Sequence, residues 1–380
     1  MQIVAQGAQD KYLTVDPEIT FFKSMYRRHT NFAVESIEQT FNGTVGPKGK
    51  VSATISRNGD LVHRMWLELT LPALAESHNT PRAAGDAYAA IDNISIEIGG
   101  TRVDRHYGDW MKIRDELMHE HGKRGHLFDD TTGGVTEFPK VANTVKADEL
   151  KVRIPLSFWF CKDAGQALPL IALQYHEVKV NVEFKATGSN SDGSTGFLAD
   201  TKASLWVDYI YLDTAERQRF ARSQHEYLIE QVQTTNKESI SGATDKIRLN
   251  FNHPVKELIW TAYGSSTSAK LSASNYDKGL KLAKLKLNGH DRFAERDAAY
   301  FNKVQQYQHH SGQSDAYVYS FALDPEKLQP SGTCNFSRID NAELELTMED
   351  STYGGEATVY AVNYNVLRIK NGMGGLAYSN

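Results

Sequence analysis

The best candidates for chemistry in this sequence are three places where histidine precedes glutamate. His119, Glu120 and His121 form the strongest metal-binding candidate, and the others are His176-Glu177 and His225-Glu226. A zinc-protease motif needs a second histidine four residues after the first, but those positions hold Lys123, Val180 and Ile229. In a predicted helix, two histidines spaced by two residues point about 200° apart and cannot share one ion. We therefore predict no metal site and no cofactor.

Two further motifs also fail as active sites. Gly372 to Ala377 fits the G-x-G-x-x-A dinucleotide pattern, but only three residues follow it, so no helix could present its N-terminus to a pyrophosphate. His309-His310 lies in a polar stretch and is interpreted as a surface or interface pair rather than a catalytic base. The sequence thus predicts no catalytic residue, and the protein is not expected to be an enzyme.

Composition narrows the class of protein further. Lys and Arg number 42 against 47 Asp and Glu, a net charge of −5, which argues against a chain that coats nucleic acid. No secretory signal is recognised, and no apolar run approaches the roughly 20 residues that span a bilayer. The two cysteines, Cys161 and Cys334, are expected to be free thiols. The sequons at Asn42, Asn93 and Asn335 are expected to be unmodified.

Most of the chain alternates apolar and polar residues with a period of two, which is typical of strands with one buried face. A clear example is Val178, Val180, Val182 and Phe184, separated by polar residues. Gly99-Gly100 and Asn288-Gly289 each stand between two such runs and predict hairpin turns. Antiparallel sheets that form sandwiches are the expected fold.

Helices are expected to be few and short. Asp16-Pro17 predicts a helix start with Ile19, Phe22 and Tyr26 on one side. A second helix is predicted from about Asp104 to His121, and a third is predicted to start near Asp291. The basic residues Lys23, Arg27, Arg28 and His29 either stabilise the end of the first helix or contact an anionic membrane or partner.

An internal repeat organises the whole sequence. Strand, hairpin, helix and closing Tyr-rich strand occur in the same order in both halves, at offsets that fall from 193 (255 − 62) through 189 (289 − 100) to 155 (367 − 212). This predicts one fold used twice, with shorter late loops in the second copy. The sequence thus predicts an all-β double jelly roll: two tandem, eight-stranded antiparallel sandwiches with a few short helices in loops and at the N-terminus. The predicted divisions are an N-terminal segment (1–30), the first jelly roll (31–213), a linker (214–224) and the second jelly roll with its tail (225–380).

Several segments, in order along essentially the whole chain, carry a family resemblance. They include Gly7-Ala8-Gln9-Asp10, Tyr26-Arg27-Arg28-His29-Thr30-Asn31-Phe32, Phe158-Trp159-Phe160-Cys161, Gln174-Tyr175-His176-Glu177-Val178, Leu287-Asn288-Gly289-His290-Asp291 and Asn363-Tyr364-Asn365-Val366-Leu367-Arg368. Together they resemble the major capsid proteins of nucleocytoplasmic large DNA viruses, a group that includes iridoviruses and algal phycodnaviruses. The chain looks short for that family.

The resemblance implies a structural protein that forms trimeric, pseudo-hexameric capsomers in the icosahedral shell of a large double-stranded DNA virus, assembled in the host cytoplasm. Its implied partners are other copies of itself, minor capsid and penton proteins, and peripherally an internal viral membrane, without direct contact with nucleic acid. Residues 1–30 are then expected to be an inner-face segment of the shell. Two alternatives stay open at this point: a capsid-like scaffold that shapes a viral membrane, and a jelly-roll lectin or cupin-type enzyme.

Overall fold

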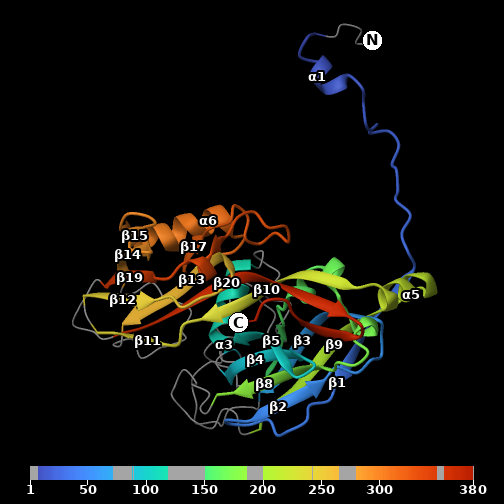
Figure 1. Cartoon of the computed structure of the whole chain (residues 1–380), viewed down its shortest axis with the longest axis horizontal. Helices are drawn as coiled ribbons and strands as arrows, with labels where there is room; N and C mark the ends of the chain where they lie inside the picture. Colours follow the sequence, from blue (N-terminus) through green and yellow to red (C-terminus); the bar gives the residue numbers. More distant parts are fainter. Residues whose placement is uncertain are drawn as a thin grey trace, which may run out of the picture.

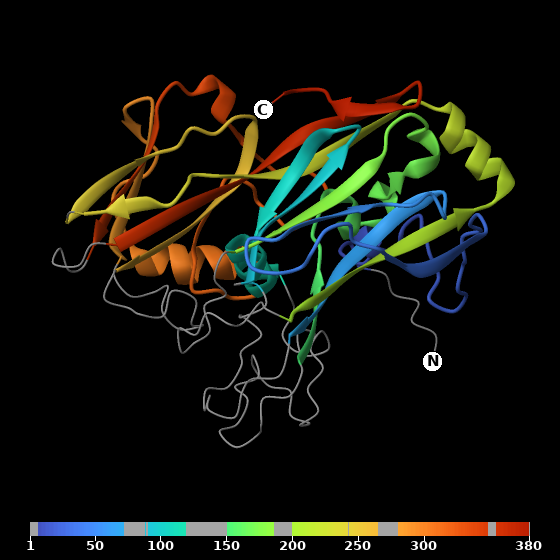
Figure 2. The ribbon, with the colours of Figure 1, turned by 90° about the horizontal axis from the view of Figure 1, so that it is seen from below.

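We describe the protein from a computed structural model that places residues 7–71, 88, 90–118, 150–185, 200–241, 243–264, 280–348 and 355–379. Two antiparallel sandwiches lie side by side, the first in blue to green and the second in yellow to red (Figures 1 and 2). In the part of the chain so described, no helix is both long and apolar enough to cross a membrane.

The first sandwich consists of sheets A and B. Sheet A has the strand order β1-β9-β3-β6, with β7 paired to β3, and sheet B has the order β2-β8-β4-β5. The strands are β1 (Phe32–Gln39), β2 (Lys50–Thr54), β3 (Leu61–Leu71), β4 (Ile91–Ile98), β5 (Thr101–Tyr107), β6 (Leu150–Pro155), β7 (Leu168–Pro169), β8 (Val178–Phe184) and β9 (Lys202–Leu212).

The second sandwich consists of sheets C and D. Sheet C has the order β10-β20-β13-β17, with β11, β18 and β21 paired to its strands, and sheet D has the order β12-β19-β14-β15, with β16 paired to β14. The strands are β10 (His225–Thr234), β11 (Glu238–Ile240), β12 (Thr244–Arg248), β13 (Pro254–Gly264), β14 (Leu280–Leu287), β15 (His290–Asp291), β16 (Arg296–Asp297), β17 (Tyr317–Ser320), β18 (Cys334–Asn335), β19 (Ala342–Met348), β20 (Gly355–Lys370) and β21 (Met373–Leu376).

The two sandwiches have the same topology. Sheet C repeats sheet A strand for strand (β10, β20, β13 and β17 for β1, β9, β3 and β6), and sheet D repeats sheet B in the same way. Even the short β7 beside β3 has a counterpart in β18 beside β13. Four repeated strands per sheet make eight per sandwich, so the predicted double jelly roll is confirmed.

The expected alternation produces the strands, and the expected turns join them. β8 and β19 alternate buried and half-buried residues along their whole length. Gly99 and Gly100 join β4 to β5 with φ of 60° and 81°, and Asn288 and Gly289 join β14 to β15 with φ of 50° and 80°. Positive φ at both central residues is the geometry of a tight hairpin turn, which glycine and asparagine tolerate best.

The helices differ more from expectation than the strands do. They are α1 (Lys11–Thr14), α3 (Gly108–Met118), α4 (Trp159–Lys162), α5 (Thr214–Arg222) and α6 (Gln305–His309), with 3₁₀ turns η2 (Ala164–Gln166), η3 (Leu170–Ala172) and η5 (Phe336–Arg338) and a π turn η4 (Tyr300–Val304). The second predicted helix starts four residues late, because residues 104–107 pair with β4 as the end of β5. The third starts later than predicted because residues 290–291 and 296–297 first form β15 and β16. α5 occupies most of the predicted linker, with the Asp213 side chain capping its first turn.

The predicted helix after Asp16-Pro17 is wrong. Residues 17–31 contain no helix and extend away from the sandwiches (Figure 1). Ile19, Phe22 and Tyr26 are 70%, 98% and 87% exposed, so the apolar stripe finds no surface to pack on. Short helices draw most of their stability from such packing, and without it this segment stays extended.

Each sandwich has its own core, and a third apolar cluster joins them. Met65, Leu67 and Val180 lie in the first core, and Leu258, Trp260 and Leu344 lie in the second. The third cluster places α3 of the first sandwich on sheet C of the second. In addition, Ile229, Leu367 and Ile369 from β10 and β20 pack into the first core, so the sandwiches share a substantial junction.

Candidate functional site at the junction between the sandwiches

The histidine motifs do not converge on a site. His119, Glu120 and His121 lie outside the described residues. His176 Nδ1 lies 3.0 Å from the carbonyl oxygen of Gly374, and His225 Nε2 lies 2.8 Å from that of Phe220. Among the residues that the structure places, no group of three or more His, Cys, Asp or Glu side chains could hold a metal ion.

The glycine-rich tail is a hairpin. Gly372, with φ of 78°, lies in the turn between β20 and β21, and β21 pairs back along β20. Gly374 lies close to the first sandwich, because a Cβ there would be 2.7 Å from Leu173. The tail therefore helps to join the two sandwiches.

His309-His310 is interpreted from the sequence as a surface or interface pair, and the surface alternative is wrong for His310. Residues 305–309 form α6, and the His310 side chain is fully buried. Its Nε2 lies 3.3 Å from Glu257 Oε2 and its Nδ1 lies 3.1 Å from Glu326 Oε1. These partners lie 53 and 16 residues away in sequence, so local polarity could not identify them. Burial alone would lower the pKa of His310, but the two carboxylates outweigh burial and raise it to about 9.

A buried ion-pair cluster occupies the junction itself. Glu230 on β10 pairs with Lys162 of α4 through one carboxylate oxygen, and its other oxygen lies 2.7 Å from Lys256 Nζ on β13. The Lys256 side chain is 0% exposed and also donates to the carbonyl oxygen of Pro325 at 2.6 Å. Glu230 thus holds one cation from each sandwich.

A β-bulge and two neighbouring charges shape this cluster. β13 shifts register between Val255 and Glu257, so Lys256 is the bulged residue, and a bulge redirects its side chain. Burial alone would raise the pKa of Glu230, but Lys162 and Lys256 outweigh it and hold the pKa at about 2. Two consecutive charges inside an otherwise apolar strand, Lys256-Glu257, were the sequence signal that could have predicted this buried network.

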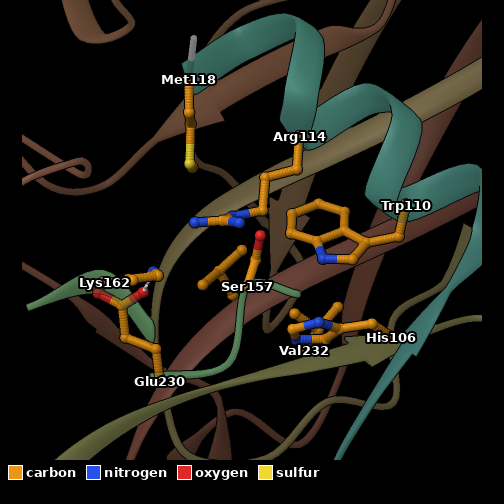
Figure 3. Close-up of a pocket in the computed structure, with 9 residues that line it drawn as sticks. His106, Trp110, Arg114, Met118, Ser157, Lys162, Glu230 and Val232 are labelled. Atoms are coloured by element: carbon orange, nitrogen blue, oxygen red, sulfur yellow. Dashed lines mark hydrogen bonds and ion pairs between the residues drawn. The ribbon is translucent and has the colours of Figure 1, made fainter. Parts of the chain in front are cut away.

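A small pocket lies beside the cluster (Figure 3). Its lining from the first sandwich includes Trp110, Arg114 and Lys162, and its lining from the second includes Glu230 and Val232. Figure 3 shows Arg114 reaching from α3 toward Ser157, next to the linked Lys162 and Glu230. The two sandwiches are therefore held together here both by ion pairs and by apolar packing.

Hydrogen bonds extend the junction on both sides of the cluster. Gln166 Nε2 donates to the carbonyl oxygen of Leu228 at 3.0 Å, and Val232 N donates to Asp104 Oδ1 at 3.2 Å. Gly312 N donates to the carbonyl oxygen of Leu117 at 2.7 Å. Because these bonds reach from several elements of each sandwich, they fix the orientation of the two sandwiches.

Both cysteines are free thiols in the structure. Burial raises the pKa of Cys161 to about 12 and also raises that of Cys334. Thiols that stay protonated at neutral pH are poor nucleophiles.

The three N-glycosylation sequons differ in exposure. Asn93 is only 4% exposed, and its side-chain amide donates hydrogen bonds to Asp92 and Glu183. Asn42 and Asn335 are exposed.

Comparison with known protein families identifies this two-sandwich architecture. The family described as "Major capsid protein N-terminus" matches residues 20–213, and that described as "Large eukaryotic DNA virus major capsid protein" matches residues 216–375. The chain belongs to the major capsid proteins of large eukaryotic DNA viruses. It is a structural component of a virus capsid, not an enzyme.

Relatives in this family match along their whole length. The major capsid protein of Pyramimonas orientalis virus is 50% identical over 410 residues, covering 100% of this chain and 99% of that protein. The major capsid protein of Paramecium bursaria Chlorella virus 1 is 44% identical over 441 residues with the same coverage. The solved structure of PBCV-1 VP54 superposes with a TM-score of 0.81 at 40% identity, over 95% of this chain and 100% of that one.

Proposed function

We propose that this capsid protein assembles as a homotrimer with a pseudo-six-fold outline. The observation that carries the proposal is the repeated strand order within one chain. Three chains then contribute six similar sandwiches, which favours a six-sided capsomer closed by one heterologous contact between chains. Such capsomers would tile an icosahedral shell assembled in the host cytoplasm, with penton and minor capsid proteins as partners.

The division of the chain is part of this proposal. Residues 31–213 and 225–380 would each act as one jelly-roll unit, with 214–224 as the connection. The junction cluster around Glu230 supports two units held in one fixed orientation. We propose no catalytic, cofactor-binding or metal-binding residue in either unit.

We also propose that residues 1–30 lie on the inner side of the shell, against minor capsid proteins or the surface of an internal membrane. In the single chain, Tyr12, Phe21, Phe22 and Met25 are each at least 89% exposed. Large apolar side chains in that state are stabilised by burial against a neighbour. The adjacent Arg27 and Arg28 suit an anionic surface. Antibodies or proteases that reach residues 1–30 on intact particles would contradict this placement.

Light scattering on the purified protein tests the trimer. The expected mass is about three times the 42.5 kDa of one chain. A monomer at every accessible concentration, together with absence from purified virions, would refute the proposal. Presence in purified virions also distinguishes a permanent shell subunit from a scaffold that is shed after assembly.

A further inference from the structure

The two sandwiches of one chain meet through a helix laid on a sheet. Trp110, Ile113 and Leu117 of α3 are at most 1% exposed and pack on the outer face of sheet C. There they contact a cluster that includes Ile259 and Tyr360, with the Trp110 and Tyr360 rings 5.3 Å apart. The first sandwich therefore supplies the helix in this contact, and the second supplies the sheet face.

The second sandwich has a counterpart of α3 whose outer side is uncovered. Residues 300–309 (η4 and α6), which we call the donor helix, lie between β16 and β17 just as α3 lies between β5 and β6. Phe301 anchors the donor helix in the second core at 0% exposure. On its opposite side, Val304 is 41% exposed and Tyr307 is 90% exposed. Tyr307 follows the fully buried Leu117 by 190 residues (307 − 117), close to the 189 that separate the hairpin turns.

The first sandwich has a counterpart of the sheet face that α3 covers. This counterpart is the outer face of sheet A, and no equivalent of α3 packs on it among the described residues. On β3, Met65, Leu67 and Leu69 face the core, so Trp66 points outward because strand side chains alternate. Trp66 pairs with Trp206 and Pro155 across sheet A, in the same way that Ile259 pairs with Tyr360 and Val318 across sheet C.

The rest of this surface matches as well. The Trp66 and Trp206 rings stack 6.3 Å apart and both residues keep part of their surface exposed. On the edge strand β1, Phe32 and Val34 are each 56% exposed. On the corresponding strand β10, Val232, which faces outward opposite Val362, packs against the apolar cluster that α3 covers. We call the outer side of sheet A with these four residues the acceptor face (Phe32, Val34, Trp66 and Trp206).

One chain cannot join these two surfaces itself. In both ribbon views the donor helix and β1 lie on opposite sides of the molecule, with α3 between them (Figures 1 and 2). A protein that carries complementary but distinct surfaces on opposite sides associates head to tail, and such contacts form a ring when the rotation between successive copies closes.

We propose that the donor helix of one chain docks on the acceptor face of a second copy, repeating between chains the contact that α3 makes with sheet C within one chain. Tyr307 and Val304 then pack on the face that carries Trp66, Trp206 and Val34. This inference rests on the proposed trimer and assigns the surfaces that hold it together.

Two single variants test the contact, because each blocks only one surface. Tyr307→Asp disables the donor helix and Val34→Asp disables the acceptor face, and both side chains are exposed in the single chain. Each substitution should raise the concentration needed for half-assembly by at least about tenfold, the effect of removing a central interface residue. Tyr175→Asp, at a position that is 76% exposed in the first sandwich, is the matched control and should leave the trimer intact. Circular dichroism and thermal melting verify that the variants are folded.

Mixing the two variants gives the sharper result. The Val34→Asp chain keeps a working donor helix and the Tyr307→Asp chain keeps a working acceptor face, so an equimolar mixture should form a one-to-one dimer that neither variant forms alone. Native mass spectrometry, with a mass tag on one of the two chains, measures whether this one-to-one dimer forms. Hydroxyl-radical footprinting of the unmodified trimer provides a test without variants: Tyr307 should be protected and Tyr175 should remain reactive.

The outcomes separate this inference from the proposed function. If the unmodified protein is a monomer at every accessible concentration and is absent from purified virions, the trimer itself is refuted. If it is a trimer and both variants also form trimers, the surface assignment is refuted while the trimer stands. Variants that fail to assemble and also fail to pair when mixed, or a Tyr307 that stays reactive in the trimer, would show that these two surfaces do not face each other.

Discussion

Replacing Glu230 by glutamine should destabilise the fold at the junction between the sandwiches. Glu230 is the counter-charge of Lys256, whose side chain is 0% exposed, at 2.7 Å. Glutamine keeps the shape and one hydrogen-bonding oxygen but leaves a buried cation without its negative partner. Removing one member of a buried ion pair typically costs about 3–5 kcal/mol.

The pKa of the Glu230 carboxyl gives a second estimate of the free energy that this ion pair contributes to stability. It is held at about 2, against an ordinary value of 4.5. At 1.36 kcal/mol per pH unit, this difference corresponds to about 3 kcal/mol of stability. Because the folded pKa is the lower one, that stability is present above pH 4.5 and is lost as the pH falls toward 2. The effect of Glu230→Gln should therefore shrink when the solution is acidified.

Denaturant unfolding at one fixed protein concentration measures both effects. The matched control is Glu226→Gln on the same strand, whose pair with Arg368 is 2.8 Å long but has side chains 61% and 56% exposed. Exposed pairs contribute about 0–1 kcal/mol, so the control should unfold nearly as the unmodified protein does. Adding Lys256→Met to Glu230→Gln should recover part of the loss, since it removes the unpaired cation. Equal midpoints for Glu230→Gln and Glu226→Gln at pH 7 would refute the argument.

Three other predictions concern single residues. His310, with its pKa raised to about 9 from 6.5, contributes stability below pH 6.5 that is lost as the pH rises through 9, and His310→Gln should abolish this decline in unfolding experiments across that range. Gly100→Ala should lower the free energy of unfolding by about 1–2 kcal/mol, because Gly100 has a left-handed backbone conformation. Gly99→Ala should lower the melting temperature further, because the added Cβ of residue 99 would also lie 2.4 Å from His176 Nδ1. Cys161, with a pKa of about 12, should react slowly with a thiol reagent at pH 8 in the folded protein, whereas denatured, unreduced protein should titrate two thiols.

The strands and their duplication could be predicted because their causes are local. Alternation in β8 and β19 and turn residues such as Gly99-Gly100 and Asn288-Gly289 depend on neighbours in sequence. The order of these elements, repeated at falling offsets, was then enough to predict two copies of one sandwich. Both sheets of each copy have that order.

The failures share a different cause, which is contact at long range. The stripe of Ile19, Phe22 and Tyr26 has helical spacing but no surface to pack on, so no helix forms. His310 looked like a surface residue because its partner Glu257 lies 53 residues away in sequence, on strand β13. The junction cluster was missed for the same reason, since Glu230 meets Lys162 from a different sandwich. Patterns along the chain describe each sandwich, whereas the junction depends on how two sandwiches meet.

The duplication within one chain also changes the thermodynamics of building a ring. Six separate sandwiches would need five bimolecular associations, each losing translational and rotational freedom worth about 4–15 kcal/mol. In the proposed trimer, three chains need only two, because the contact of α3 with sheet C forms within one molecule. Half of the helix-on-sheet contacts would then form at a rate and extent independent of protein concentration. Dilution would act only on the contacts between chains, so the ring would come apart into intact pairs of sandwiches.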